Sequence, residues 1–222
     1  MRKVEENLPA TNEGYGTREY CGTRRAWRNS CGCWEVADDS EGPEHNFDWF
    51  LKPDYLLPIF EELTADIKVG KDARILMLGC GNSQLSEVMY DAGWTNIVNV
   101  DYSTACIEQM TQRHGEARPK MTWLEMDVMN LTFGDEEFDM VVDKGKLRER
   151  GTADGQERWS ERIVTGETNP SAMLTTKGDP WPHFRKRYLQ DRAGWKLSTK
   201  TIGPPEGFDY FQYLLEWEPE SA

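Results

Sequence analysis

The amino-acid sequence predicts an α/β fold whose sheet is doubly wound and mostly parallel. Three observations carry this prediction. Short apolar runs alternate with amphipathic stretches over residues 74–143, a pattern typical of βαβ units. One apolar run ends in a glycine-rich turn, and the next ends in an acidic residue. Near the C-terminus two strand patterns follow one another directly, which indicates an antiparallel hairpin.

The elements of the parallel part follow in order along the chain. A first helix is predicted over residues 55–67, where apolar residues recur at helical spacing. A second helix over 84–92 ends at Gly93, and a third over 103–114 begins with Ser103, a good N-cap residue. The apolar runs between them predict parallel strands at 74–78, 96–100, 122–125 and 138–143.

The C-terminal third departs from this alternation. Residues 183–189 have a helical pattern, and residues 194–202 and 208–217 predict the two strands of the hairpin. Between Lys144 and Trp195 we find no apolar run suited to a fifth parallel strand, so we expect the sheet to lack it. Losing a central strand would expose the backbone edges of its two neighbours.

Composition limits the classes of function. With 222 residues the chain suits one domain, and its net charge of −13 argues against a nucleic acid or an anionic membrane as the main partner. The acidic surface favours a basic substrate, or it serves only solubility. No run of about 18 apolar residues encodes a membrane span, and the N-terminus lacks the apolar region of a secretory signal.

The five cysteines indicate a reducing, cytoplasmic setting rather than a disulfide framework. Cys21, Cys31 and Cys33 lack the paired spacing of a zinc site, so no metal is expected. Residues 1–46 are poor in periodic apolar pattern and are predicted to form a poorly ordered arm, which precedes one domain over residues 47–222.

The glycine-rich turn and the acid after the next strand indicate a nucleoside site. Gly79 and Gly81 let backbone N–H groups approach a ligand, and Asp101 is placed to accept hydrogen bonds from ribose hydroxyls. A dinucleotide fingerprint needs a third glycine where Gln84 stands, which disfavours a nicotinamide dehydrogenase. A nucleoside without phosphates fits better, namely S-adenosylmethionine with its methionine part near the turn. The alternative is an ordinary strand–helix turn followed by a surface acid.

Two further strand ends supply candidate residues. Asp127 and Val128 follow the third strand, where a carboxylate accepts from the adenine amine and a backbone N–H reaches a ring nitrogen. The motif Asp143-Lys144-Gly145 ends the fourth strand at the same edge of the sheet. Lys144 alone reads equally well as a solvated loop lysine.

Taken together, these motifs resemble those of the seven-strand, Rossmann-like S-adenosylmethionine-dependent methyltransferases, and among them the branch that methylates lysines of translation elongation factor 1-alpha. The resemblance covers residues 47–145 and parts of 171–217, including Phe47-Asp48-Trp49-Phe50. It implies protein-lysine methylation with S-adenosyl-L-methionine as cofactor and elongation factor 1-alpha as the protein substrate. It also implies a cofactor pocket made of Trp49, Gly79, Asp101, Tyr102, Asp127, Val128 and Lys144.

The chain departs from the family pattern in its arm and around the missing strand. Glu19-Tyr20 is followed by Cys21, residues 146–170 form an insertion that reads as a loop, and Trp181 directly precedes Pro182, where the family has a helix and the fifth strand. Two alternatives therefore stay open: a methyltransferase with another protein or a small molecule as acceptor, or a catalytically degenerate variant of the fold. No catalytic base is assigned, although Asp143 is a candidate for the rim that holds the acceptor amine.

Overall fold

The computed structural model describes residue 48 and residues 51–128, 130–134, 137–144, 171–177, 195–203 and 210–217. The sequence-based expectations for the arm (1–46), the insertion (146–170) and the helix at 183–189 lie outside these residues, as does Trp49. Within the described residues, no helix is long and apolar enough to cross a membrane.

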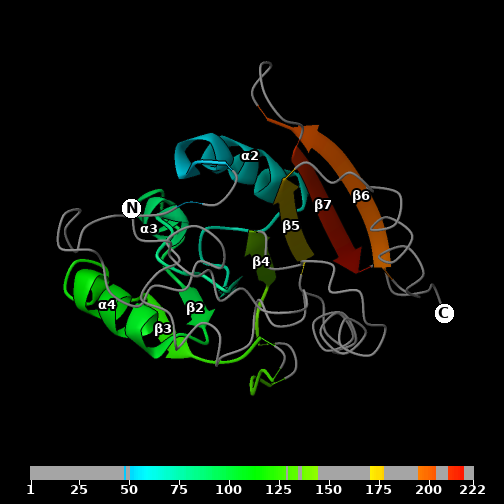
Figure 1. Ribbon diagram of the computed structural model, residues 1–222. Coiled ribbons are helices and arrows are strands. Elements are labelled where there is room, and N and C mark those ends of the chain that lie inside the picture. The colour runs from blue at the N-terminus through cyan, green and yellow to red at the C-terminus, as the bar shows by residue number, and fades with distance from the viewer. Residues whose placement is uncertain are drawn as a thin grey trace, which may run out of the picture.

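A seven-stranded sheet forms the centre of the molecule (Figure 1). Its strand order is β3-β2-β1-β4-β5-β7-β6. The strands are β1 (Ile75–Leu78), β2 (Ile97–Asp101), β3 (Thr122–Glu125), β4 (Met140–Lys144), β5 (Ser171–Lys177), β6 (Trp195–Ile202) and β7 (Tyr210–Trp217). Strands β1 to β5 pair in parallel, whereas β7 pairs antiparallel with both β5 and β6. The chain moves outward from β1 in both directions, so the predicted doubly wound fold class is confirmed, with its topological switch point between β1 and β4.

The expectation of a missing fifth strand is wrong. Residues Ser171–Lys177 form β5, which pairs in parallel with β4 from Met140 to Lys144 and antiparallel with β7 on its other side. A strand paired on both edges gains its ladder hydrogen bonds from its neighbours, so β5 forms without a continuous apolar run. The sheet therefore has no gap at its centre.

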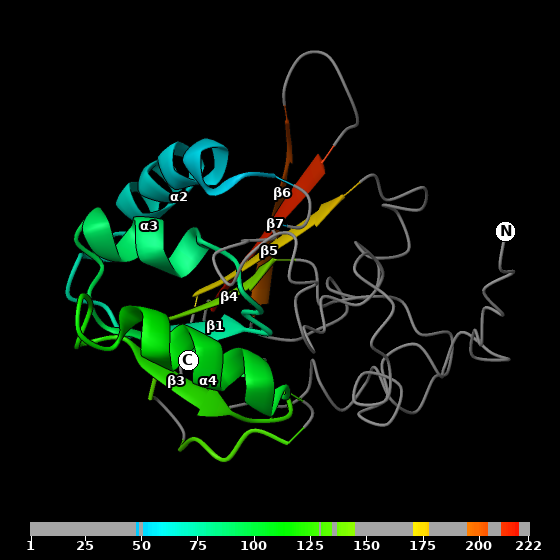
Figure 2. The same ribbon diagram turned by 60° about the vertical axis from the view of Figure 1, so that its left-hand side comes forward.

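Three helices pack on one face of the sheet, stacked beside it in Figure 2. Helix α2 (Pro53–Asp66) has proline at its first turn, α3 (Leu85–Asp91) follows the glycine-rich turn, and α4 (Thr104–His114) is capped by the Ser103 hydroxyl, which accepts from the Cys106 N–H. All three helices share one core cluster with inward residues of the sheet, including Leu56, Phe60, Met89, Ile107, Met77 and Val142.

The opposite face of the sheet carries a second core cluster. Leu78, Val100 and Val141 contribute from the parallel strands, and Tyr213 contributes from β7. Half-buried apolar residues of the segment after β3, such as Phe133, pack against this cluster. Because side chains alternate along a strand, the two clusters together account for both faces of β1, β2 and β4.

Candidate functional site

The carboxyl ends of β1 to β4 meet at one edge of the sheet, and most of the predicted site residues lie there. Asp101 and Lys144 are the last residues of β2 and β4, and Gly79 directly follows β1. Asp127 and Val128 come just after β3. Ligands of open α/β sheets bind at this edge, beside the switch point between β1 and β4. The fold therefore gathers six of the seven predicted residues, Tyr102 included, and Trp49 lies outside the described part.

The glycine-rich turn is built on left-handed backbone. Gly79 and Gly81 have φ values of 55° and 53°, which residues with a Cβ rarely adopt. A Cβ placed on Gly81 would meet nothing within 4 Å, so the backbone faces open space at that point. The Cys80 N–H donates to the Val100 carbonyl at 3.0 Å and ties the turn to the end of β2. The turn thus presents bare backbone to a space that a ligand can fill.

Asp101 fixes the turn from the β2 side. One carboxylate oxygen accepts from the Gly81 N–H at 3.0 Å, and the other accepts from the Ser103 N–H at 3.1 Å. The side chain is buried, with 4% of the residue exposed. These two backbone donors hold the carboxylate in one orientation at the end of β2, beside the open side of the turn.

A residue that the sequence analysis did not single out fixes the turn from the β4 side. Asp48 accepts a hydrogen bond from the Ser83 hydroxyl and one from the Gln84 N–H at 3.4 Å. It also forms an ion pair with Lys144, whose Nζ lies 2.5 Å from the Asp48 Oδ1. The available signal was its position inside Phe47-Asp48-Trp49-Phe50, directly before the predicted pocket residue Trp49.

Lys144 is not a solvated loop lysine. Only 8% of its side chain and 10% of that of Asp48 are exposed. Burial lowers the pKa of Lys144 from its ordinary value, and the negative charge of Asp48 and its hydrogen bond oppose this shift. A positive charge paired with a negative one therefore lies near the glycine-rich turn. Because both side chains are almost buried, water screens these charges only weakly.

The remaining predicted residues flank Asp101 and β3. Tyr102 is half-buried next to Asp101, and Asp127 is exposed, with its carbonyl accepting the Asn130 N–H at 2.8 Å. Val128 is half-buried and packs against the second core cluster. Asp143 is buried and, by strand alternation, lies on the opposite face of β4 from Lys144.

These positions fit S-adenosylmethionine in the order of the strands. From β3 to β4 the edge carries Asp127, Asp101, the bare turn at Gly81, and then the Asp48–Lys144 pair. Neighbouring strands lie about 4.7–4.9 Å apart, so Asp101 and Lys144 are separated by two strand spacings. An elongated nucleoside with a charged amino-acid end matches this succession, whereas a pyrophosphate finds no third glycine.

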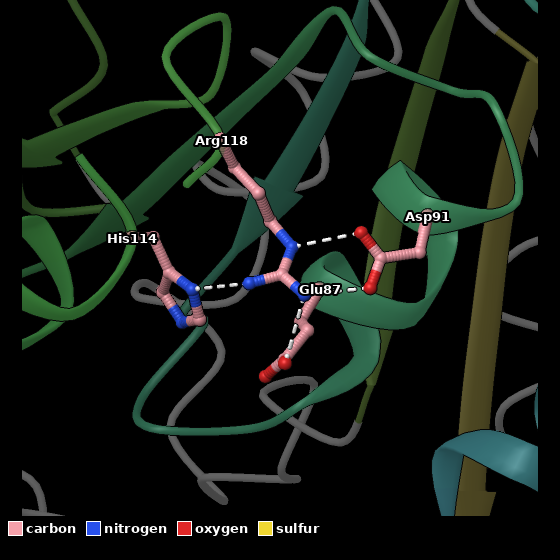
Figure 3. Close-up of polar contacts among 4 residues, drawn as sticks. All are labelled: Glu87, Asp91, His114 and Arg118. Carbon is pink, nitrogen blue, oxygen red and sulfur yellow. Dashed lines mark hydrogen bonds and ion pairs between the residues drawn. The ribbon is translucent and has the colours of Figure 1, made fainter. Parts of the chain in front are cut away.

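A second cluster of charged residues lies away from this edge (Figure 3). Arg118 donates to both carboxylate oxygens of Asp91 at 3.0 and 2.6 Å, to Glu87 at 3.0 Å, and contacts the His114 Nδ1 at 3.1 Å. Asp91 ends α3 and His114 ends α4. Because both helices run back from the carboxyl edge, this cluster lies at the amino edge of the sheet.

Comparison with known proteins defines the class to which this chain belongs. A family profile described as "Methyltransferase domain" matches residues 75–161. A solved structure of magnesium protoporphyrin IX methyltransferase from Synechocystis PCC 6803 with bound SAM is similar, with a TM-score of 0.56 over 73% of this chain and 78% of that chain. At 14% identity this likeness shows the fold alone.

Sequence relatives narrow the class further. "EEF1A lysine methyltransferase 4" of Bos taurus is 32% identical over 94% of this chain and 78% of that protein. "eEF1A lysine and N-terminal methyltransferase" of Bos taurus is 47% identical over 66% of this chain, but the match spans only 21% of that longer protein. The mouse protein of the same name is matched over 17% of its length.

The chain belongs to the class I S-adenosylmethionine-dependent methyltransferases, and within them it lies close to the eEF1A lysine methyltransferases. The predicted family, methyltransferase class and cofactor are thereby confirmed. The individual site residues stay predictions, because none of these likenesses tests them.

Proposed function

We propose that this chain transfers a methyl group from S-adenosylmethionine to a lysine side chain of translation elongation factor 1-alpha. The observation that carries the acceptor is the match to an EEF1A lysine methyltransferase over 94% of this chain. The net charge of −13 agrees with a basic acceptor, because opposite charge speeds and orients encounter. We place the reaction in the cytoplasm, where buried cysteines such as Cys80 and Cys106 stay reduced.

Residues at the carboxyl ends of the parallel strands bind and orient S-adenosylmethionine in this proposal. When bound, the cofactor supplies an activated methyl group on a sulfonium. Asp101 holds the ribose, Asp127 and Val128 hold the adenine, and Tyr102 flanks the two rings. Trp49, which follows Asp48 directly in sequence, is a predicted residue of this pocket. An aromatic face there would attract the cationic sulfonium.

Alignment of the acceptor supplies most of the rate in this proposal. Holding the reacting groups in line is worth roughly 7–11 kcal/mol in favourable cases. A free lysine has a pKa near about 10.4, so the acceptor amine must lose its proton before it reacts. We assign no residue of this chain as the base.

Methyl transfer to the purified factor tests the proposal directly. The chain is incubated with S-adenosylmethionine and unmodified recombinant elongation factor 1-alpha, and peptides are analysed by mass spectrometry. The proposal predicts one or more lysines heavier by methyl increments, with none in the Asp101→Ala variant. Labelled cofactor incubated with a cell lysate distinguishes the alternative acceptors, because label on another protein or in the small-molecule fraction would replace the assigned substrate.

The degenerate alternative makes a different prediction. A chain that has lost cofactor binding shows no thermal shift with S-adenosylhomocysteine. A functional pocket gains about 2.7 kcal/mol of stability when the ligand is present at 100 times its dissociation constant. The continuous sheet through β5 favours the functional reading, because the strand whose absence suggested degeneracy is present.

A further inference from the structure

The Asp48–Lys144 ion pair lies at the rim of the candidate site and is almost buried. Its two members lie 96 residues apart in sequence and come from the segment before α2 and from the end of β4. Both side chains are withdrawn from water almost entirely, with exposed fractions of 10% and 8%. Removing two charges from water is costly and is repaid only partly by their attraction, so stability alone is a weak reason for the pair.

The position of the Asp48–Lys144 pair on the sheet edge indicates which part of the cofactor it would contact. Asp101 marks the ribose on β2, and the backbone of Gly81 is open above β1. Lys144 is the next group along the edge, on β4. If the ribose lies at Asp101, the amino-acid end of the cofactor reaches past the turn towards Ser83, Asp48 and Lys144. That end is a zwitterion, with one ammonium and one carboxylate.

The need to keep each buried charge paired favours a ligand that binds to Asp48 and Lys144 at the same time. A buried charge left without a partner costs several kcal/mol. A ligand that carried only an anion would draw Lys144 away from Asp48 and leave the aspartate uncompensated. A zwitterion brings an ammonium for Asp48 and a carboxylate for Lys144. The net charge of the site is therefore zero both before and after the ligand binds.

We propose that Asp48 and Lys144 recognise the amino-acid end of S-adenosylmethionine, with Asp48 binding its ammonium and Lys144 binding its carboxylate. This inference rests on the proposed function and adds a binding residue to it. The Ser83 hydroxyl and the Gln84 N–H hold the Asp48 carboxylate from the side of the turn. Asp48 therefore stays in position when Lys144 turns to the ligand.

A crossed titration tests the assignment charge by charge. Affinities are measured by calorimetry for S-adenosylhomocysteine, for its analogue with hydrogen in place of the carboxylate, for its analogue with hydrogen in place of the ammonium, and for methylthioadenosine, which lacks the amino-acid end. Asp48→Asn is expected to weaken only the two ligands that carry the ammonium, by about tenfold or more. Lys144→Met is expected to weaken only the two that carry the carboxylate, to a similar degree.

The design separates this inference from a folding defect and from the proposed function. Methylthioadenosine binding serves as the folding control, and the double variant Asp48→Asn/Lys144→Met avoids a lone buried charge. Asp54→Asn removes the same charge from an exposed position in the first turn of α2 and is expected to change none of the four affinities. Equal or tighter binding of S-adenosylhomocysteine by Asp48→Asn would overturn the inference. Absence of binding by the unaltered chain would overturn the proposed function with it.

Discussion

Two clusters of charged side chains, at opposite edges of one sheet, use the same chemistry differently. At the amino edge Arg118 joins Asp91 and Glu87 of α3 to His114 of α4. At the carboxyl edge Asp48 joins Lys144 of β4 to the glycine-rich turn. Arg118 meets partly exposed carboxylates, with 57% of the Asp91 side chain accessible, whereas both members of the second pair are nearly buried.

The difference separates a structural contact from a binding site. Arg118 donates to both carboxylate oxygens of Asp91, and this hydrogen bonding raises the pKa of the guanidinium, so the charge of Arg118 is paired within the chain. The Asp48–Lys144 pair lies where the strand ends, the bare turn and Asp101 converge. We therefore expect changes at the first cluster to alter stability and changes at the second edge to alter ligand binding.

The largest effect on binding is expected from Asp101→Ala. Loss of the carboxylate removes charged hydrogen bonds to the ribose, which costs roughly 1.5–3 kcal/mol, or about ten- to a hundredfold in affinity. Calorimetry with S-adenosylhomocysteine measures it, with Asp54→Ala, which removes an exposed carboxylate in the first turn of α2, as a control that we expect to be neutral. Unchanged affinity in Asp101→Ala would remove this residue from the site.

Arg118→Met should give the converse result. It breaks the contacts that join α3 to the chain after α4, and partial exposure moderates the cost to about 1–2 kcal/mol of unfolding free energy. Urea denaturation measures the loss, with Lys120→Met as an exposed control that we expect to be neutral. Affinity for S-adenosylhomocysteine should not change, and a tenfold loss would show that the two edges are coupled.

A smaller effect is expected when a glycine at each edge of the sheet is changed to alanine. Gly81 and Gly93 both have positive φ, at 53° and 110°, but Gly93 follows α3 at the amino edge. Either glycine changed to alanine should lower stability by about 1 kcal/mol through backbone strain. Only Gly81→Ala should also weaken S-adenosylhomocysteine, because its methyl group enters the open space beside the turn. Equal affinities in the two variants would contradict a ligand at Gly81.

The smallest expected effect is the change of folding stability with pH that the buried His114 at the amino edge causes. Burial lowers the pKa of His114 from 6.5, and the positive charges of Arg118 and Arg113 lower it further. The negative charges of Glu87 and Asp91 partly oppose this shift. Below 6.5 the unfolded chain therefore binds more protons than the folded chain, and stability falls as the pH drops towards the lowered pKa. His114→Gln should lose less stability than the unaltered chain between about pH 7.5 and pH 5. Identical slopes in denaturation would contradict a neutral, buried His114.

Most of the parallel sheet was predictable because its signals are local. Strand β3 has the predicted bounds, and the ends of β1, β2 and β4 lie within two residues of those predicted. Ser103 caps α4 as expected. The fifth strand was missed because Ser171–Lys177 owes its conformation to pairing with β4 and β7, which its own composition does not reveal. Asp48 was missed for a similar reason, since its partner Lys144 lies 96 residues away.

A crystal structure of the chain with S-adenosylhomocysteine tests the central claim most directly, namely that the carboxyl edge from β3 to β4 binds the cofactor in strand order. The account predicts adenine beside Asp127, ribose hydroxyls on Asp101, and the amino-acid end between Asp48 and Lys144. A nucleoside bound in the reverse direction, or away from the ends of β2 and β4, would contradict it.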